Sequence, residues 1–387
     1  MKYDFDTVTD RRGTNSYKWA VGKDVLPMWV ADMDFKTAPE IISVLSERVN
    51  HGIFGYSDVT DEWYDAYINW WDRRHGIHFD RKDIFFSTGV IPTISSCVRR
   101  LTSPAEKVII MTPVYNIFYN CILNNGRVVS ECPLAYHDGR YSIDWSELER
   151  AMRDPQTTLM LLCNPHNPIG RIWDRETLAR IGEMAYENGV VVVSDEIHCD
   201  ITDPGKMYVP FASVSEKCAK NSVTCIAPTK TFNIAGIQTS AVVASDPGLR
   251  HRVWRQLNTD ECGEPNAFAV QAAVAAFSEG EQWLDELREY IFANKQRVST
   301  FLKENIPQIK LVPSEATYLL WLDCSEITDD SKRLASEIRS KTGLYLSHGM
   351  QFGNGDRFLR MNIACPRVLL EDGLARLKKA VNIILSK

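Results

Sequence analysis

Short apolar runs, rich in β-branched residues, alternate with amphipathic stretches between about residues 83 and 245. The clearest runs are KVIIM at 107–111, TLMLLC at 158–163, VVVVS at 190–194 and SVTCIA at 222–227. Strands that are apolar on both faces and alternate with helices are typical of a largely parallel sheet covered by helices. We therefore predict an α/β fold whose active site lies at the carboxyl ends of these strands.

One amphipathic stretch illustrates the expected unit between two strands. Residues 174–188 are predicted to form a helix, with Asp174 as its N-cap and Gly189 closing it. Leu178 and Ile181 fall on one face of that helix, which we expect to pack on the sheet. The pattern thus predicts a strand, a helix and a second, parallel strand.

The pattern changes from about residue 278 to long, charged amphipathic helices separated by the strand-like run TYLLWLD. A chain of 387 residues exceeds the usual size of a single core, so two domains are expected. We predict a large α/β domain over residues 46–280 and a smaller α+β domain over residues 281–387. Residues 1–45, which include the extended phrase MWVADMDF, are expected to pack with the small domain.

Composition and charge exclude several classes of protein. Hydrophobic residues make up 44% and charged residues 24%, as in ordinary globular proteins, and the formal net charge is −6. That charge gives no broad positive field for nucleic acid or anionic lipid. No stretch is apolar enough to suggest a signal peptide or a membrane span, so we expect a cytoplasmic protein without membrane partners.

Metal and disulfide patterns are also weak. The ten cysteines contain no C-x-x-C pair, which favours scattered, reduced thiols. His75 and His78 lie three residues apart, but Gly76 interrupts the segment and no pattern of carboxylates or thiols joins them. We therefore predict no metal site.

Polar groups follow several of the predicted strands. SDEIHCD comes directly after four valines, NPHNPIGR follows the preceding strand, and APTKTFNIAG follows SVTCIA. FFSTGVIPT places a glycine between a strand and a helix, where free backbone amides can bind an anion. Each segment also has an ordinary structural explanation: a buried ion pair or helix cap, a rigid turn, a solvated lysine, or a helix start.

Taken together and in this order, the segments resemble fold-type I enzymes that depend on pyridoxal 5'-phosphate (PLP), the aspartate aminotransferase superfamily. MWVADMDF, NPHNPIGR, SDEIHCD and KTFNIAG are most similar to the bacterial cystathionine β-lyases and cysteine-S-conjugate β-lyases. The resemblance covers nearly the whole chain. It implies a large domain with a mostly parallel seven-stranded sheet between helices, together with a smaller α+β domain.

The resemblance also implies roles for individual residues. Lys230 would hold PLP as a Schiff base, and Asp195 would pair with the pyridinium nitrogen and keep the ring an electron sink. Asn167 would bind the phenolic oxygen of PLP, with His198 standing where many relatives have a tyrosine with the same partner. Tyr115 would stack on the ring.

The phosphate of PLP would be held mainly by backbone amides and one hydroxyl. Two positions depart from the aminotransferase pattern: Ala227 stands where serine is common and Gln238 where arginine is common. Binding would therefore depend on the remaining ligands that the resemblance implies, which are Gly89, Val90, Ile91 and Thr229.

Two further residues would complete the site. Arg360 would bind the α-carboxylate of an amino-acid substrate, for which its planar fork is suited. Tyr56 would reach across a dimer interface to the phosphate of the neighbouring cofactor, which implies a homodimer with shared active sites. Trp29, Tyr318 and Trp321 could line the pocket, but aromatic residues in strands are more often part of the core.

The reaction that the resemblance favours is α,β-elimination from cystathionine or another S-substituted L-cysteine, giving a thiol, pyruvate and ammonia. The alternative is an aminotransferase of class I or II, because both reactions begin with removal of the Cα proton. A regulatory protein that uses the same fold to bind a partner is a third possibility. The residues alone do not separate the first two reactions.

Overall fold

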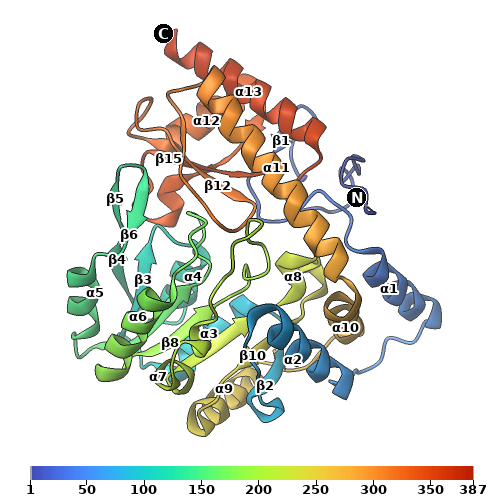
Figure 1. Ribbon diagram of the computed structural model, residues 1–387, viewed down its shortest axis with the longest axis vertical. Coiled ribbons are helices and arrows are strands. Elements are labelled where there is room, and N and C mark those ends of the chain that lie inside the picture. Colours follow the sequence, from blue (N-terminus) through green and yellow to red (C-terminus); the bar gives the residue numbers. More distant parts are fainter. Residues whose placement is uncertain (1, 387) are drawn as a thin grey trace.

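A seven-stranded sheet forms the centre of the computed structural model, which describes residues 2–386 (Figure 1). Its strand order is β2-β10-β9-β8-β7-β3-β4. Only β10 runs antiparallel to its neighbours, and the other paired strands are parallel. The bounds are β2 Ile84–Ser87, β3 Lys107–Thr112, β4 Val128–Pro133, β7 Thr157–Cys163, β8 Val191–Asp195, β9 Ser222–Ile226 and β10 Ser240–Val243. The predicted α/β fold is confirmed.

Helices cover both faces of this sheet because neighbouring residues of its buried strands point to opposite sides. In β3, Ile110 packs in a cluster with α3, α4 and α9, whereas Ile109 packs with α5, α6 and α7. The helices around the sheet are α2 Asp61–His75, α3 Val90–Leu101, α4 Ile117–Leu123, α5 Trp145–Met152, α6 Arg175–Glu187, α7 Glu216–Lys220, α8 Pro228–Thr231, α9 Pro247–Thr259 and α10 Ala269–Glu279. The predicted helix at 174–188 is α6, and the Asp174 carboxylate accepts a hydrogen bond from the Thr177 amide (2.7 Å).

A second sheet, antiparallel and four-stranded, lies above the first in Figure 1. Its order is β11-β12-β15-β14, with β11 Lys310–Leu311, β12 Leu319–Asp323, β14 Ser347–His348 and β15 Phe358–Asn362. The long helices of this part of the chain are α11 Glu281–Asn305, α12 Ser331–Thr342 and α13 Arg367–Leu385.

The N-terminal part of the chain joins this region through a short parallel pair, β1 Leu26–Pro27 with β13 Leu344–Tyr345. The domain boundaries at residues 45 and 280 stay predictions. The remaining regular elements are α1 Pro39–His51, β5 Ala135–His137 and β6 Arg140–Ser142.

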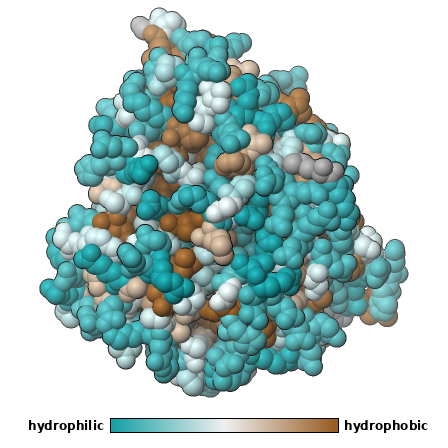
Figure 2. Space-filling view, viewed as in Figure 1, coloured by the Kyte–Doolittle hydropathy of each residue, from teal (hydrophilic) through white to brown (hydrophobic). Residues whose placement is uncertain are grey.

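The face in Figure 2 is largely hydrophilic, with hydrophobic residues gathered near its centre. Within residues 2–386, no helix combines the length and apolar character needed to cross a bilayer. The expected cytoplasmic location stays a prediction. All ten cysteines are buried as free thiols. His75 contacts Asp200 (2.8 Å), whereas the exposed His78 lies 3.5 Å from Asp72, so the two histidines have different partners.

Candidate active site

A cavity of about 250 Å³ lies at the carboxyl ends of the parallel strands. Cys163 ends β7 and Asp195 ends β8, while α8 carries Lys230 immediately after β9. The first turn of α3 and the N-terminal segment complete the walls. The lining residues are Ala31, Thr88, Gly89, Val90, Ile91, Pro92, Tyr115, Cys163, Asn167, Asp195, Ile197, His198, Thr229, Lys230, Ala235 and Gln238.

Lys230 projects into this cavity from a short helix that begins at Pro228, where the fixed φ of proline favours the first helical turn. Its Nζ donates a hydrogen bond to the Ala31 carbonyl (2.6 Å). Burial lowers the pKa of Lys230 to about 8, against the opposing effect of the Asp32 charge. A lysine with such a pKa supplies a neutral, nucleophilic amine near physiological pH.

Asp195 lies on the floor of the same cavity and is almost fully buried. Burial raises the pKa of its carboxyl to about 7, although a hydrogen bond from the Ile197 amide (3.2 Å) acts in the opposite direction. A buried carboxylate with so few donors is well suited to pair with a cationic group of a ligand.

Arg360, on β15 of the second sheet, contacts the cavity through the lining residue Asn167. Its guanidinium donates to the Asn167 side-chain oxygen (3.1 Å) and to the Trp29 carbonyl (3.0 Å). Burial lowers the pKa of Arg360 to about 10. Among the described residues, its Nε and the Nδ1 atom of His198 have no hydrogen-bond partner although both are buried. Burial also lowers the pKa of His198 to about 3, which keeps its ring neutral.

At the opposite end of the cavity, α3 begins directly after Gly89 and presents its first backbone amides. A helix N-terminus of this kind attracts anions. Among the residues that line the cavity, Lys230 is the one lysine or arginine.

The match to known proteins extends over most of the chain. A family model described as aminotransferase class I and II matches residues 15–377. The chain belongs to this family. It is 43% identical to cystathionine beta-lyase PatB of Bacillus subtilis (strain 168), over 98% of this chain and 100% of that protein.

Solved structures of this aminotransferase family agree with that match. A PLP-bound structure from Clostridium difficile 630, described as an aminotransferase, gives a TM-score of 0.95 at 38% identity, over 98% of this chain and 100% of that one. The PLP-bound C-S lyase from Staphylococcus hominis gives a TM-score of 0.93 at 33% identity, over 98% of each chain. The chain is therefore similar in fold to a lyase and to a protein described as an aminotransferase.

Within this aminotransferase fold, two of the residues expected at the site lie elsewhere than in the cavity lining. Arg360 touches the site through Asn167, as described above. Tyr56 lies on the segment between α1 and α2, and its side chain is fully exposed. Of the two residues that depart from the aminotransferase pattern, Gln238 lines the cavity, and Ala227 is buried and is not among the lining residues.

The sequence interpretation assigned no role to Ala31 of MWVADMDF or to Asn233 of KTFNIAG, and it favoured a core role for Tyr318, which lies just before β12. Ala31 lines the cavity, and the Tyr318 hydroxyl donates to the Ala31 carbonyl (3.1 Å). The side chain of Asn233 bonds the backbone of Met33 and Phe35. Ala31 lies in MWVADMDF and Asn233 in KTFNIAG, two segments that the sequence analysis singled out. Nothing in either segment indicated that the two segments contact each other. Trp321 is a core residue, fully buried beside Phe358.

Proposed function

We propose that the chain is a PLP-dependent carbon–sulfur β-lyase that cleaves cystathionine or related S-substituted L-cysteines to a thiol, pyruvate and ammonia. The observation that carries the proposal is the convergence of Lys230, Asp195 and the Asn167–Arg360 pair at one cavity. These groups are a nucleophilic amine, a carboxylate for a cationic nitrogen and a site for an α-carboxylate. The 43% identity to a cystathionine beta-lyase over the full length supports the choice of reaction.

The residues present fit PLP. The buried carboxyl of Asp195 matches the pyridine nitrogen, and the α3 N-terminus with Thr229 matches the phosphate. The side-chain oxygen of Asn167 is engaged by Arg360, which leaves its amide hydrogens available for the phenolic oxygen. His198 Nδ1, buried without a partner, is a second group available at that side of the cavity. Tyr115 would stack on the ring.

Bound PLP supplies an aromatic ring that accepts the electrons left at Cα when its proton is removed. With PLP bound, Lys230 would hold it through its side-chain amine, and the same amine, when free, would remove the Cα proton of the substrate. Arg360 binds the substrate carboxylate and fixes the orientation of the Cα–H bond. Asp195 would keep the pyridine nitrogen of bound PLP protonated, which would make the ring a stronger electron acceptor. The thiolate then leaves from Cβ.

A homodimer with shared active sites is part of the proposal. Tyr56 lies with Ile53 and Phe54 on an exposed apolar segment, residues 52–60, which is unusual for a free surface. Since the cavity is lined by few groups that could bind a phosphate dianion, a tyrosine from a second subunit would add one. We further propose the division into domains at residues 45 and 280.

The test is pyruvate release from L-cystathionine without any keto-acid acceptor, together with a visible absorption spectrum and a Lys230→Ala control. Pyruvate from yellow wild-type protein, and none from the control, is expected. A protein that PLP cannot colour would overturn the cofactor assignment.

An aminotransferase remains the second candidate because a PLP-bound structure described as an aminotransferase has the same fold. The same assay separates the two reactions. A yellow protein that releases no pyruvate, but converts an amino acid once 2-oxoglutarate is added, is an aminotransferase.

A further inference from the structure

The segment Met28–Phe35 is irregular, yet side chains from distant parts of the chain bind most of its carbonyl oxygens. Ser347 and Arg360 donate to Trp29, and Asn362 donates to Val30 and Asp32 (2.6 Å each). Asn233, three residues after Lys230, donates to Met33 (3.1 Å) and Phe35 (2.8 Å). The segment is therefore fixed on one side by the second sheet and on the other by the turn that follows α8, the helix that carries Lys230.

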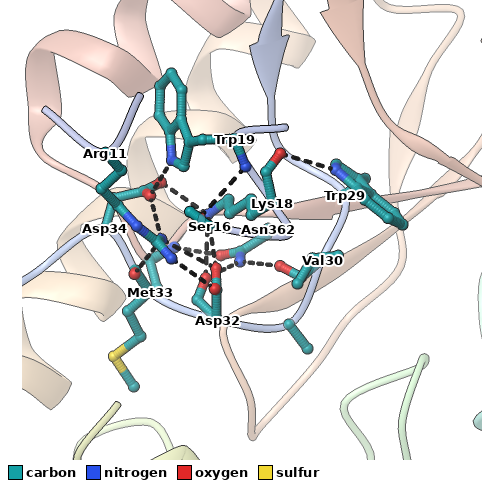
Figure 3. A network of polar contacts seen from close by, with 12 residues as sticks. Arg11, Ser16, Lys18, Trp19, Trp29, Val30, Asp32, Met33, Asp34 and Asn362 are labelled. Carbon is teal, nitrogen blue, oxygen red and sulfur yellow. Dashed lines mark hydrogen bonds and ion pairs between the residues drawn. The ribbon is translucent and has the colours of Figure 1, made fainter. Parts of the chain in front are cut away.

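Two cations, Lys18 and Arg11, pair with two carboxylates of the same segment, Asp32 and Asp34 (Figure 3). Lys18 is almost fully buried, and its Nζ lies 2.7 Å from the Asp34 carboxylate. Arg11 binds Asp32 (2.8 Å) and Asp34 (2.8 Å), and the Trp19 indole N–H also donates to Asp34 (2.8 Å). The network places two carboxylates beside two cations, so it fixes the segment without a net charge. A network of this size is more than the packing of a loop requires.

What the segment presents to the cavity is the Ala31 carbonyl. This oxygen accepts from Lys230 Nζ (2.6 Å) and from the Tyr318 hydroxyl (3.1 Å). A neutral amine that donates one hydrogen to a fixed carbonyl keeps its lone pair free and loses rotation about Cε–Nζ. The charged groups that act on Lys230 are Asp32 and Asp195, which favour its cationic form, and Arg360, which opposes it.

We infer that Met28–Phe35 is a positioning element for the catalytic lysine: the Ala31 carbonyl orients the freed Lys230 amine, and Asp32 supplies a negative charge beside it. The inference rests on the proposed function, because it concerns the lysine that carries PLP and removes the proton. Asp32 pairs with Arg11 (2.8 Å) and Lys18 (3.7 Å) and makes no hydrogen bond to Lys230, so its charge acts on the lysine through space. Neutral His198, Tyr115 and Tyr318 complete the surroundings of the amine.

The test is Asp32→Asn, which removes the charge and keeps the shape. Protonation at Lys230 in its linkage to PLP changes the visible absorption, so the holoenzyme can be titrated without turnover. Loss of a nearby negative charge disfavours the cationic form. The midpoint pH of this spectroscopic titration is therefore expected to fall by about half to one pH unit relative to wild type. The acidic limb of kcat should move in the same direction.

Asp34→Asn is the matched control, since it makes the same chemical change in the same network at a carboxylate that pairs with Lys18 and Arg11, whereas the charges that act on Lys230 are those of Asp32, Asp195 and Arg360. It should lower thermal stability and move the midpoint by less than about 0.2 pH unit. Equal shifts in both variants, or no shift in Asp32→Asn, would overturn the inference. A protein with a normal visible band but no lyase activity would contradict the proposed function alone, and one without the band would contradict both.

Tyr318→Phe tests the carbonyl itself and serves if Asp32→Asn does not fold. Without the second donor, the Ala31 carbonyl is held less firmly, so kcat for L-cystathionine should fall roughly three- to tenfold with KM within about twofold. A rise in KM with unchanged kcat would assign Tyr318 to substrate binding and overturn its positioning role.

Discussion

Three buried carboxylates stand within six residues of one another in SDEIHCD, and their hydrogen bonds separate their roles. Glu196 accepts from Ser194 (2.8 Å), from the Phe211 amide (2.9 Å) and from Tyr208. Asp200 is bound by the side chains of Trp70 (2.9 Å), His75 (2.8 Å) and Thr231 (3.0 Å). Asp195 has one backbone donor, at 3.2 Å. Glu196 and Asp200 therefore hold the structure together, and Asp195 is left for a ligand.

The pKa shifts of Asp200 and Asp195 differ in the same way as their hydrogen bonds. Burial alone would raise the pKa of Asp200, but its hydrogen bonds and the charges of His75 and Arg74 outweigh burial and lower it. At Asp195 burial prevails, and the pKa rises to about 7. A cationic ring nitrogen beside Asp195 would lower that value and retain its own proton.

Asp195→Asn should therefore reduce kcat by roughly a hundredfold or more, because a neutral amide no longer stabilises the charged nitrogen during proton removal. Its thermal stability should change little. The measurement is kcat for L-cystathionine at saturating PLP, with the melting temperature of each variant. Asp200→Asn is the comparison: it should lower the melting temperature and retain more activity. If Asp200→Asn lost more activity and Asp195→Asn lost more thermal stability, the roles given to these two carboxylates would be wrong.

A buried histidine gives a pH-dependent prediction at the same scale. Burial lowers the pKa of His166 to about 4. A histidine with a depressed native pKa favours folding above its unfolded pKa of about 6.5, and that contribution is lost as the pH falls, because the unfolded chain then binds the proton more readily. Between pH 7 and pH 5 the loss should be about 2 kcal/mol. Urea unfolding of wild type and of His166→Gln at both pH values measures this loss of unfolding free energy. Equal losses in the two proteins would contradict the prediction.

At the scale of elements, the N-terminal segment depends on a buried ion pair between Lys18 and Asp34. Lys18→Met leaves the two carboxylates, Asp32 and Asp34, with Arg11 as their shared cation, so one buried negative charge is uncompensated and the variant should lose about 3–5 kcal/mol of unfolding free energy. Lys217→Met makes the same change in an exposed pair with Glu183 and should cost less than about 1 kcal/mol. The midpoint of urea unfolding compares the two variants. Similar losses in both would show that Lys18 contributes through its packed alkyl chain.

The elements also show how much could be predicted from the sequence. Apolar β-branched runs predicted β3, β7, β8 and β9, since a strand buried on both faces has few other residue choices. Because active sites of such sheets lie at the carboxyl ends of the parallel strands, Asp195, Asn167 and Lys230 were expected at one edge of the sheet. The structure places all three at one cavity.

The contacts that the sequence did not indicate join residues far apart in the chain, and no side-chain motif marks them. Ala31 contributes a backbone carbonyl to a lysine 199 residues away, which no local pattern encodes. Tyr318 is a fully buried aromatic next to a strand, so its pattern is that of a core residue and its hydroxyl contact is hidden. Arg360 lies in a sheet of the second region, and only the resemblance connected it with the site.

For the whole molecule, the placement of Tyr56 is the feature that most directly bears on assembly. Its side chain is fully exposed on a segment with two other exposed apolar residues, Ile53 and Phe54. In an isologous dimer each copy would contribute the same segment to the other, so two sites would each need two chains. A variant that lacks Tyr56 and one that lacks Lys230 would then damage the same site from different subunits.

Mixing these two variants gives the last prediction. Tyr56→Ala should weaken PLP binding and Lys230→Ala should abolish activity, each as a homodimer. Random reassociation makes about half of the dimers mixed, and one of the two sites in each mixed dimer combines intact Lys230 with intact Tyr56. Lyase activity should therefore recover to about a quarter of the wild-type value at a PLP concentration that leaves Tyr56→Ala largely empty. Refolding the two chains separately before mixing is the control, since no exchange should give no recovery. Activity that merely equals the average of the two parents would mean that each site is built from one chain, and the role of Tyr56 would have to be abandoned.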